Sequence, residues 1–362
     1  MTERAHLTCT LGPCILAIVA AACSGAGNGG SSGDAQATPG SASGDSGGPI
    51  DMRAPDAPAG TASSDSSMPG TSSGTSAPGD DASAGAPAAD AAGNPSEGAA
   101  TSPPPSDAAA PPGWKLTWSD EFNGADGSAV DPTKWKHDVG GTGWGNNELE
   151  YYTDATQNAV VQGGYLVITA TDQGASQYKC SYGTCKYTSA RLLTQGLFSQ
   201  QYGRFEARAQ MPTGKGLWPA IWALGDNIST VSWPACGEVD FMETIGTDIS
   251  TNHGSLHMPK SYGPTGTYKL PGGASYADAF HTFAFEWEPG TIRFYVDDML
   301  YETQNQSSVP SGDTWEFDHP FFLLINVAVG GQWPGSPDST TKFPQTLKVD
   351  WVRVYQKDAT EP

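Results

Sequence analysis

Three carboxylates lie close together in one short stretch of the chain: Glu238, Asp240 and Glu243. The residues between and around them are β-branched, aromatic or otherwise apolar, a composition typical of a β-strand. Side chains of a strand alternate between its two faces, so Glu238 and Asp240 share a face. A pair of carboxyl groups on either side of a scissile bond is what glycoside hydrolysis requires. The spacing therefore indicates that chemistry.

Glu243 lies an odd number of residues from Asp240, so a regular strand would turn it to the opposite face. One inserted residue, a β-bulge at Phe241 or Met242, would return Glu243 to the face of the other two acids. The alternative is a sheet edge with solvated acids, but the apolar neighbours favour a central strand. Acids on such a strand are costly unless they line a polar cleft. We therefore expect a bulge and a cleft.

The elements that position these acids are short strands. Residues 202–211 and 281–287 alternate apolar and polar side chains, and turn residues at 288–290 lead into another alternating run. Residues 321–329 are apolar almost throughout, as in a strand in the middle of a packed sheet. No helical period lasts more than a turn or two. These patterns predict an all-β fold, a β-sandwich jelly roll of two antiparallel sheets packed face to face.

Composition divides the 362 residues into three parts. Residues 1–22 include a short apolar stretch and are interpreted as a secretory signal peptide. Residues 23–113 are rich in Ala, Gly, Ser and Pro, which predicts a disordered tether. Cys23 follows three alanines in a sequence that resembles a bacterial lipoprotein cleavage box, and would carry the lipid anchor. All 11 tryptophans lie beyond the tether, so residues 114–358 are predicted to form the catalytic domain.

This organisation predicts an exported protein, anchored at the cell surface as a lipoprotein or, in the alternative, secreted. Any contact with a membrane would be made through the lipid anchor alone. The formal net charge of −21, with no cluster of Lys and Arg, excludes nucleic acid as a partner on electrostatic grounds. The acidic charge suits a secreted protein that acts on a neutral ligand, although solubility is the simpler explanation.

The domain keeps three of the 6 cysteines. Cys180 and Cys185 flank a turn-forming tetrapeptide and are able to close a small disulfide in an oxidising compartment. Cys236 would then remain a buried thiol that behaves as a small apolar side chain. Neither the spacing nor the histidines indicate zinc.

Residues 237–243, Gly-Glu-Val-Asp-Phe-Met-Glu, resemble the bulged active-site signature of glycoside hydrolase family 16. Further segments resemble the laminarinase-like endo-β-1,3-glucanase branch of that family and follow in order along the domain: 119–124, 143–148, 151–153, 202–208, 216–222, 254–257, 326–333 and 350–355. The resemblance implies a jelly roll whose concave sheet forms the substrate cleft. It also implies that Glu238 is the nucleophile, Glu243 the acid/base, and Asp240 the residue that holds and tunes the pair, with no cofactor for catalysis.

Eight residues are candidates for binding the substrate. Trp218 and Trp233 each precede a proline, which suits a loop at the edge of a cleft, although a single Trp more commonly packs in a core. Glu206 and Arg208 share the polar face of one strand and would either bind sugar hydroxyls or form an ion pair across the cleft. The resemblance alone adds the other four: Asn146, His257, Asn326 and Trp333. His257 alone would be interpreted as a structural histidine.

Family 16 members often carry one structural calcium ion on the side away from the cleft. The matching positions here are Glu121 and Asp350. Two carboxylates together with backbone carbonyls and waters are adequate ligands for calcium. The alternative is a pair of solvent-exposed acids.

The main interpretation is a monomeric, retaining endo-β-1,3-glucanase whose partner is a laminarin-like β-glucan. One alternative keeps the fold and mechanism but acts on mixed-linkage glucan or an agarose-type galactan. The other is a non-catalytic glucan-binding lectin. Such relatives typically lack one or more of the catalytic acids, and all three are present in this chain.

Overall fold

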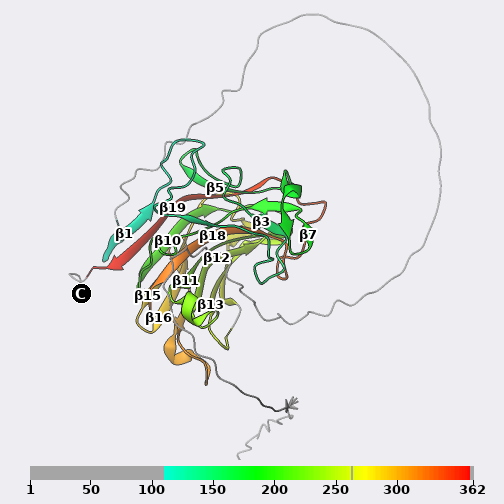
Figure 1. Ribbon diagram of the computed structural model, residues 1–362. Helices are drawn as coiled ribbons and strands as arrows, with labels where there is room; N and C mark the ends of the chain where they lie inside the picture. The colour runs from blue at the N-terminus through cyan, green and yellow to red at the C-terminus, as the bar shows by residue number, and fades with distance from the viewer. Residues whose placement is uncertain (1–109, 262–263, 359–362) are drawn as a thin grey trace, which may run out of the picture. The chain divides into compact units, whose positions relative to one another are not determined.

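The computed structural model describes residues 110–261 and 264–358, and nearly all of the elements in them are β-strands (Figure 1). The predicted signal peptide, Cys23 and nearly all of the predicted tether lie outside the described residues. Within the described ranges, no helix has the length and apolar character needed to cross a bilayer.

The first large sheet has eight antiparallel strands in the order β17-β16-β15-β10-β19-β5-β4, with β1 also paired to β19. Both β5 and β1 pair with the same long strand, because β5 pairs with the first part of β19 and β1 with its last part. The bounds of these strands are β1 Trp114–Asp120, β4 Ala159–Gln162, β5 Tyr165–Ala170, β10 Gly203–Gln210, β15 His281–Glu288, β16 Thr291–Val296, β17 Met299–Asn305 and β19 Gln345–Lys357.

The second large sheet has seven antiparallel strands in the order β14-β13-β12-β11-β18-β9-β2. Their bounds are β2 Lys136–Asp138, β9 Arg191–Leu193, β11 Leu217–Gly225, β12 Glu238–Ile245, β13 Asp248–His257, β14 Pro264–Lys269 and β18 Phe321–Val329. The strand that carries the three acids, β12, lies between β11 and β13 and is therefore not an edge strand.

The remaining elements are short. Two two-stranded ribbons pair β3 (Glu150–Tyr152) with β8 (Tyr187–Ser189) in parallel, and β6 (Lys179–Cys180) with β7 (Gly183–Thr184). The described residues contain one α-helix, α1 (Ile228–Val231), and three 3₁₀ turns: Ala175–Gln177, Pro271–Gly273 and Gln306–Ser308.

The hydrophobic core lies between the two large sheets. On β10 the core residues are Phe205, Ala207 and Ala209, and on β18 every second residue from Phe321 to Val329 joins them. This is the consequence of the period-two alternation of side chains along a strand. The predicted all-β fold with two packed antiparallel sheets is confirmed.

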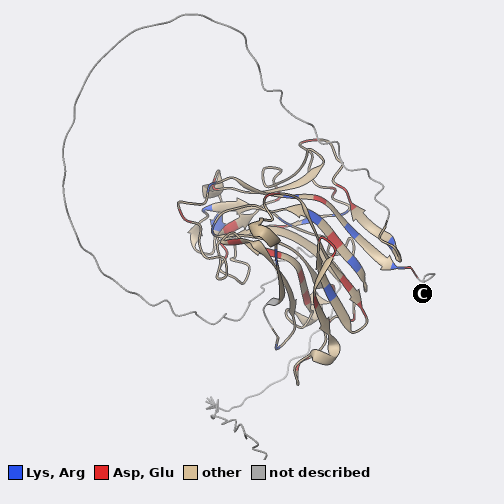
Figure 2. Ribbon diagram, turned by 180° about the vertical axis from the view of Figure 1, so that it is seen from behind, with Lys and Arg blue, Asp and Glu red and all other residues tan. Residues whose placement is uncertain are grey.

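The alternation that fills the core also places polar side chains on the outer faces. On β10 the residues between the core positions are Arg204, Glu206 and Arg208. Figure 2 shows basic and acidic residues at neighbouring positions along strands of the domain. On the seven-stranded sheet, part of the outer face is a second apolar cluster that includes Trp222, Cys236 and Leu324.

Candidate active site

The three acids of β12 lie on one face because the strand contains a bulge. In the pairing with β11, Asp240 lies opposite Trp222 and Met242 lies opposite Ile221, which leaves Phe241 as the inserted residue. Phe241 and Met242 both enter the core, and Glu243 lies on the same side as Glu238 and Asp240. The bulge predicted at Phe241 or Met242 is confirmed. We call the outer face of the seven-stranded sheet around these acids the carboxylate face.

Two tryptophans donate hydrogen bonds to the outer two acids. Trp233 Nε1 donates to Glu238 Oε2 at 2.7 Å, and Trp218 Nε1 donates to Glu243 Oε1 at 2.9 Å. His257 Nε2 lies 2.9 Å from Asp240 Oδ2 and 3.7 Å from Glu238 Oε1. Three of the eight predicted binding residues are therefore in direct contact with the acids.

The local environment favours protons on two of the acids. Burial raises the pKa of Glu243 well above its ordinary value, and that pKa is higher still whenever Asp240 is ionised. Burial also raises the pKa of Asp240, and Glu238 adds to this by its charge and by accepting a hydrogen bond from Asp240. The site can therefore keep protons on Asp240 and Glu243 while Glu238 accepts hydrogen bonds. Such a set of groups can supply both a nucleophile and a general acid.

Residues 144–353 match the family model described as glycosyl hydrolases family 16. The chain belongs to this family. A relative described as a beta-glucanase from Rhodothermus marinus is 44% identical over 259 residues, which cover 68% of this chain and 86% of the relative.

Two solved structures extend the comparison. The catalytic domain of an endo-1,3-beta-glucanase (laminarinase) from Thermotoga petrophila is 45% identical, with a TM-score of 0.63, and covers 67% of this chain and 98% of its own. A Glu-to-Ser variant of a non-specific endo-beta-1,3(4)-glucanase, solved with 1,3-beta-D-cellobiosyl-glucose at its active site, is 38% identical with a TM-score of 0.61. It covers 69% of this chain and 97% of its own.

Trp333 and Asn326 each contact a tryptophan next to the acids, whereas Asn146 contacts Glu148. Trp333, 36% exposed, makes edge-to-face contacts with Trp218 and with His253. Asn326 Oδ1, on β18, accepts a hydrogen bond at 2.8 Å from Nε1 of Trp222, which lies on β11, the strand next to β12. Asn146 Nδ2 donates to Glu148 Oε1 at 3.1 Å. The side chains of both asparagines are thus held by internal hydrogen bonds.

The prediction that Glu206 and Arg208 bind substrate beside the acids is wrong. Both lie on β10 in the eight-stranded sheet and, because Phe205 and Ala207 face the core, they point away from the seven-stranded sheet. Glu206 accepts a hydrogen bond from Arg204 at 2.8 Å, and Arg208 pairs with Asp350. Neither pair lies across a cleft from the acids. The alternation of apolar and polar residues shows that a strand has a polar face, but it does not show which sheet the strand joins.

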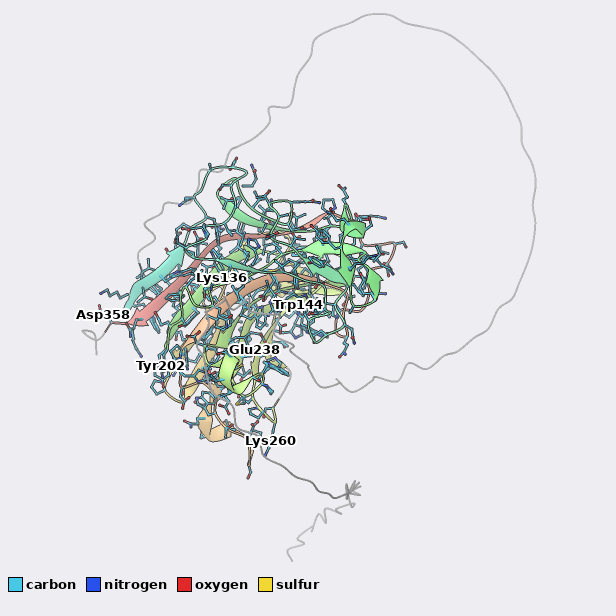
Figure 3. The ribbon with its side chains drawn as sticks, viewed as in Figure 1. Lys136, Trp144, Tyr202, Glu238, Lys260 and Asp358 are labelled. Carbon is cyan, nitrogen blue, oxygen red and sulfur yellow. A yellow bond between two sulfur atoms is a disulfide. The ribbon has the colours of Figure 1, made fainter. Side chains whose placement is uncertain are left out.

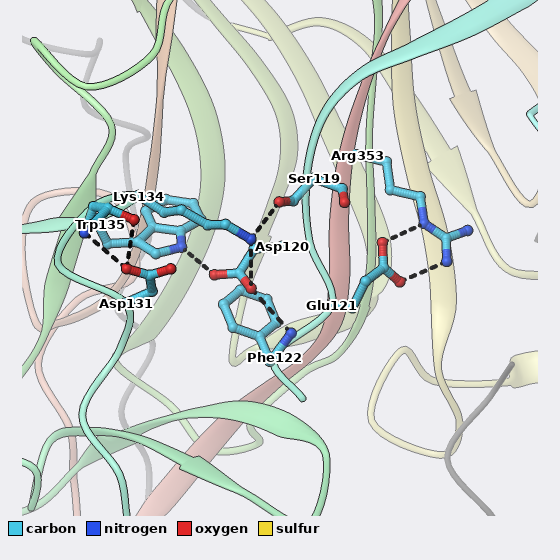
Figure 4. A network of polar contacts seen from close by, with 9 residues as sticks. Ser119, Asp120, Glu121, Phe122, Asp131, Lys134, Trp135 and Arg353 are labelled. Carbon is cyan, nitrogen blue, oxygen red and sulfur yellow. Dashed lines mark hydrogen bonds and ion pairs between the residues drawn. The ribbon is translucent and has the colours of Figure 1, made fainter. Parts of the chain in front are cut away.

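The two predicted calcium ligands do not fit a shared cation site. Both carboxylate oxygens of Glu121 accept hydrogen bonds from Arg353, at 2.9 and 2.7 Å (Figure 4). Asp350, inserted at a bulge of β19, pairs with Arg208. Each carboxylate is neutralised by its own guanidinium group, so the pair does not supply the unpaired oxygens that calcium needs. Among the described residues, the group of acids and histidine with converging ligand atoms is Glu238, Asp240 and His257, at the carboxylate face.

Sequence reasoning missed several residues around the carboxylate face. The guanidinium of Arg191 lies between the rings of Trp144 and Trp222, 4.9 and 4.8 Å from their centroids, and forms an ion pair with Asp138 at 3.0 Å. Trp144 precedes β3, and Glu238 begins β12 (Figure 3). The signal for Arg191 was a single arginine between an alanine and two leucines, because a buried arginine requires partners.

The cysteine predictions are confirmed. Cys180 and Cys185 form a disulfide, and Cys236 is a free, buried thiol. Burial raises the pKa of Cys236 to about 12, so it is unreactive as a nucleophile at neutral pH. It packs in the apolar cluster on the outer side of the seven-stranded sheet, next to the strand that carries the acids.

Proposed function

We propose that this family 16 protein is a retaining, endo-acting glycosidase that cleaves β-1,3-glucan by double displacement. The observation that carries the proposal is the bulge at Phe241, which places Glu238 and Glu243 on one face with Asp240 between them. The names of the beta-glucanase and laminarinase relatives support β-1,3-glucan as the substrate.

In the first step, the carboxylate of Glu238 attacks the anomeric carbon and the bond to the leaving glycosidic oxygen breaks. Glu243 donates its proton to that oxygen, in agreement with its raised pKa. In the second step, Glu243 takes a proton from water, the water oxygen attacks the anomeric carbon, and the bond to Glu238 breaks. Two inversions give net retention.

Asp240 and the indole groups act on the reacting acids. Asp240 donates a hydrogen bond to Glu238 and is itself held by His257, so it orients the nucleophile and stabilises its charge. Trp233 and Trp218 fix the carboxyl groups of Glu238 and Glu243 through their Nε1–H groups. The exposed ring of Trp333, next to Trp218, offers an apolar surface on which a sugar ring can stack.

The stereochemistry of the first product tests the mechanism. Proton NMR of laminarin at early times of digestion is expected to show the β-anomer of the new reducing end before mutarotation. An initial α-anomer would mean inversion and would overturn the double displacement.

A second candidate substrate is mixed-linkage glucan. It is favoured by the similarity to the non-specific endo-beta-1,3(4)-glucanase, whose description covers both linkages. Reducing-end assays of the purified protein on laminarin, lichenan, agarose and xyloglucan discriminate the candidates. We expect the highest kcat/KM on laminarin; higher activity on lichenan would reassign the preference, and no release from any polymer would favour the lectin.

We also propose that the protein is exported and acts as a monomer, and that Cys23 carries a lipid. The proposals of export and of a lipid anchor rest on the sequence of residues 1–113. Fractionation of cells that express the full chain tests the anchor. Wild type is expected in the membrane fraction, and Cys23→Ser in the soluble exported fraction. An identical distribution of the two would remove the lipid anchor.

A further inference from the structure

Two glutamates that the proposed mechanism does not use lie buried in contact with each other. Glu150, the first residue of β3, is 0% exposed, and Glu148, two residues earlier, is 6% exposed. Their carboxyl groups lie within hydrogen-bonding reach of each other. A hydrogen bond between two carboxyl groups needs a proton on one of them, and two ionised carboxylates in a buried contact would repel strongly.

The hydrogen bonds of each residue show where that proton lies. Glu148 accepts at both oxygens, from Asn146 Nδ2 and from the hydroxyl of Tyr152, each at 3.1 Å. Glu150 Oε2 accepts from the backbone N–H of Val329 at 2.7 Å, whereas Glu150 Oε1 is buried with no hydrogen-bond donor. A proton on this oxygen, donated to Glu148, satisfies both groups. Glu148 is then the ionised member and Glu150 the protonated one.

The charges around the pair agree with this assignment. Burial raises the pKa of Glu148, but the contact with Glu150, the hydrogen bond from Asn146 and the charge of Arg191 on β9 oppose that rise. Asp138 on β2 balances Arg191 through an ion pair. Burial and the charge of Glu148 hold the pKa of Glu150 well above its ordinary value. The other titratable groups that face the pair are the phenols of Tyr152 and Tyr182, which are neutral because burial raises the pKa of each.

The pair lies where segment 143–152 meets the end of β18, a strand of the seven-stranded sheet. Segment 143–152 contacts segment 326–333 through the backbone: Leu149 N–H donates to Val329 O at 2.7 Å, and Gln332 N–H donates to Asn146 O at 2.9 Å. Tyr152, which donates to Glu148, accepts from Asn326 Nδ2 at 3.2 Å. These two segments carry three of the candidate substrate-binding residues: Asn146, Asn326 and Trp333.

We propose that Glu148 and Glu150 share one proton and act as a positioning pair that holds segments 143–152 and 326–333 together for binding of the glucan chain. This proposal rests on the proposed function for its effect on substrate. Loss of the shared proton places two negative charges in contact and breaks the link. The expected result is a weaker affinity for the polymer at high pH, with little change in the chemical step.

Glu150→Gln removes the titratable proton of this side chain but keeps its size and shape. The amide Nε2 can donate to Glu148 at every pH, and the amide oxygen can still accept from Val329. Because the raised pKa of Glu150 makes the folded state bind a proton more tightly than the unfolded state, wild-type stability falls as pH rises from about 4.3 through the folded pKa. Glu150→Gln has no such loss. The difference in Tm, variant minus wild type, is expected to grow by at least about 3 °C between pH 5 and pH 8.

Kinetics with laminarin supply the second readout. The KM of wild type is expected to rise toward pH 8, whereas the KM of Glu150→Gln stays level. Glu148→Gln removes one of the acceptors for Asn146 and Tyr152 and is expected to raise KM about tenfold, with kcat within about twofold, as for the loss of one hydrogen bond to a charged group. Asp172→Asn, at an exposed carboxylate, is the matched control and should behave as wild type.

A constant Tm difference from pH 5 to pH 8, together with parallel KM profiles, would show that the pair shares no proton and would overturn the proposal. Failure of the proposed function would look different, because an inactive protein removes the KM readout and leaves the Tm readout intact. A change of kcat without a change of KM in Glu148→Gln would also contradict the positioning role.

Discussion

The two outer faces of the sandwich carry acids in opposite electrostatic environments. On the eight-stranded sheet, acids pair with guanidinium groups: Glu206 with Arg204, Asp350 with Arg208, and Glu121 with Arg353. On the carboxylate face, Asp240 is hydrogen-bonded to Glu238 and contacts one histidine, and the charge of Asp240 acts on Glu243. Glu238 and Glu243 each accept a hydrogen bond from an indole N–H group. The difference teaches that an acid paired with an arginine is balanced by a positive charge, whereas an acid buried beside other acids can hold a proton.

The pKa values show the same contrast. Hydrogen bonds from Arg293 and Lys357 hold the pKa of Glu288, on β15 of the eight-stranded sheet, below its ordinary value. Burial and Asp240 hold the pKa of Glu243 above its ordinary value. The pKa values of these two glutamates are therefore shifted in opposite directions, and only Glu243 is suited to donate a proton near neutral pH.

The largest expected effect is the loss of the nucleophile. Glu238→Gln keeps the shape of the side chain and its contact with Trp233, so Tm should change by less than about 3 °C, while kcat on laminarin falls by about 10⁴-fold or more. Glu288→Gln, on the other face, is the control and should keep kcat within about twofold. Retention of a tenth of wild-type turnover by Glu238→Gln would remove the nucleophile role.

Removal of the general acid is the next largest effect, and it depends on the leaving group. Glu243→Ala is expected to lower kcat/KM on laminarin by about 10³-fold, and on a dinitrophenyl oligoglucoside by less than about tenfold, because that leaving group departs without protonation. Parallel initial-rate measurements on the two substrates decide the point. Equal losses would leave Asp240 as the candidate acid.

A substitution on the eight-stranded sheet should affect stability and leave turnover unchanged. Arg208→Met leaves the buried carboxylate of Asp350 without its guanidinium partner, which should cost about 1–3 kcal/mol of unfolding free energy, since Arg208 itself is partly exposed. Urea denaturation gives the free energy, and laminarin assays give kcat per folded molecule. A large fall in kcat with unchanged stability would show that this pair serves catalysis and not stability, contrary to the comparison of the two faces.

The smallest effect is expected for an indole donor. The hydrogen bond from Trp218 lowers the pKa of Glu243 against the effect of burial. Trp218→Phe removes that bond, so the pKa of Glu243 should rise further and the alkaline limb of kcat/KM on laminarin should move to higher pH. A limb that moves to lower pH would show that another group controls it.

Local patterns of the sequence predicted the strands and the bulge. Alternation identified β10 and β15, and the odd spacing from Asp240 to Glu243 required an inserted residue, because a carboxylate pointing into an apolar core is costly. The disulfide followed from two cysteines that flank a turn.

Those local patterns could not predict contacts between strands that lie far apart in the sequence. Nothing local shows that β10 joins the sheet opposite β12, so Glu206 and Arg208 were assigned to the wrong face. The guanidinium groups that hold Glu121 and Asp350 come from β19 and β10, and only the fold brings them together. The spacing of Glu148 and Glu150 shows a shared face but gives no sign that both are buried.

The most direct test of the central claim is to trap the covalent intermediate in wild type and in Glu243→Ala. An activated 2-deoxy-2-fluoro-oligoglucoside with a dinitrophenyl leaving group slows the second step, so peptide mass mapping can locate the attached sugar. The account predicts a single label on Glu238 in both proteins, because the activated leaving group makes Glu243 unnecessary for the first step. A label on Asp240 or Glu243, or no label in wild type, would contradict it.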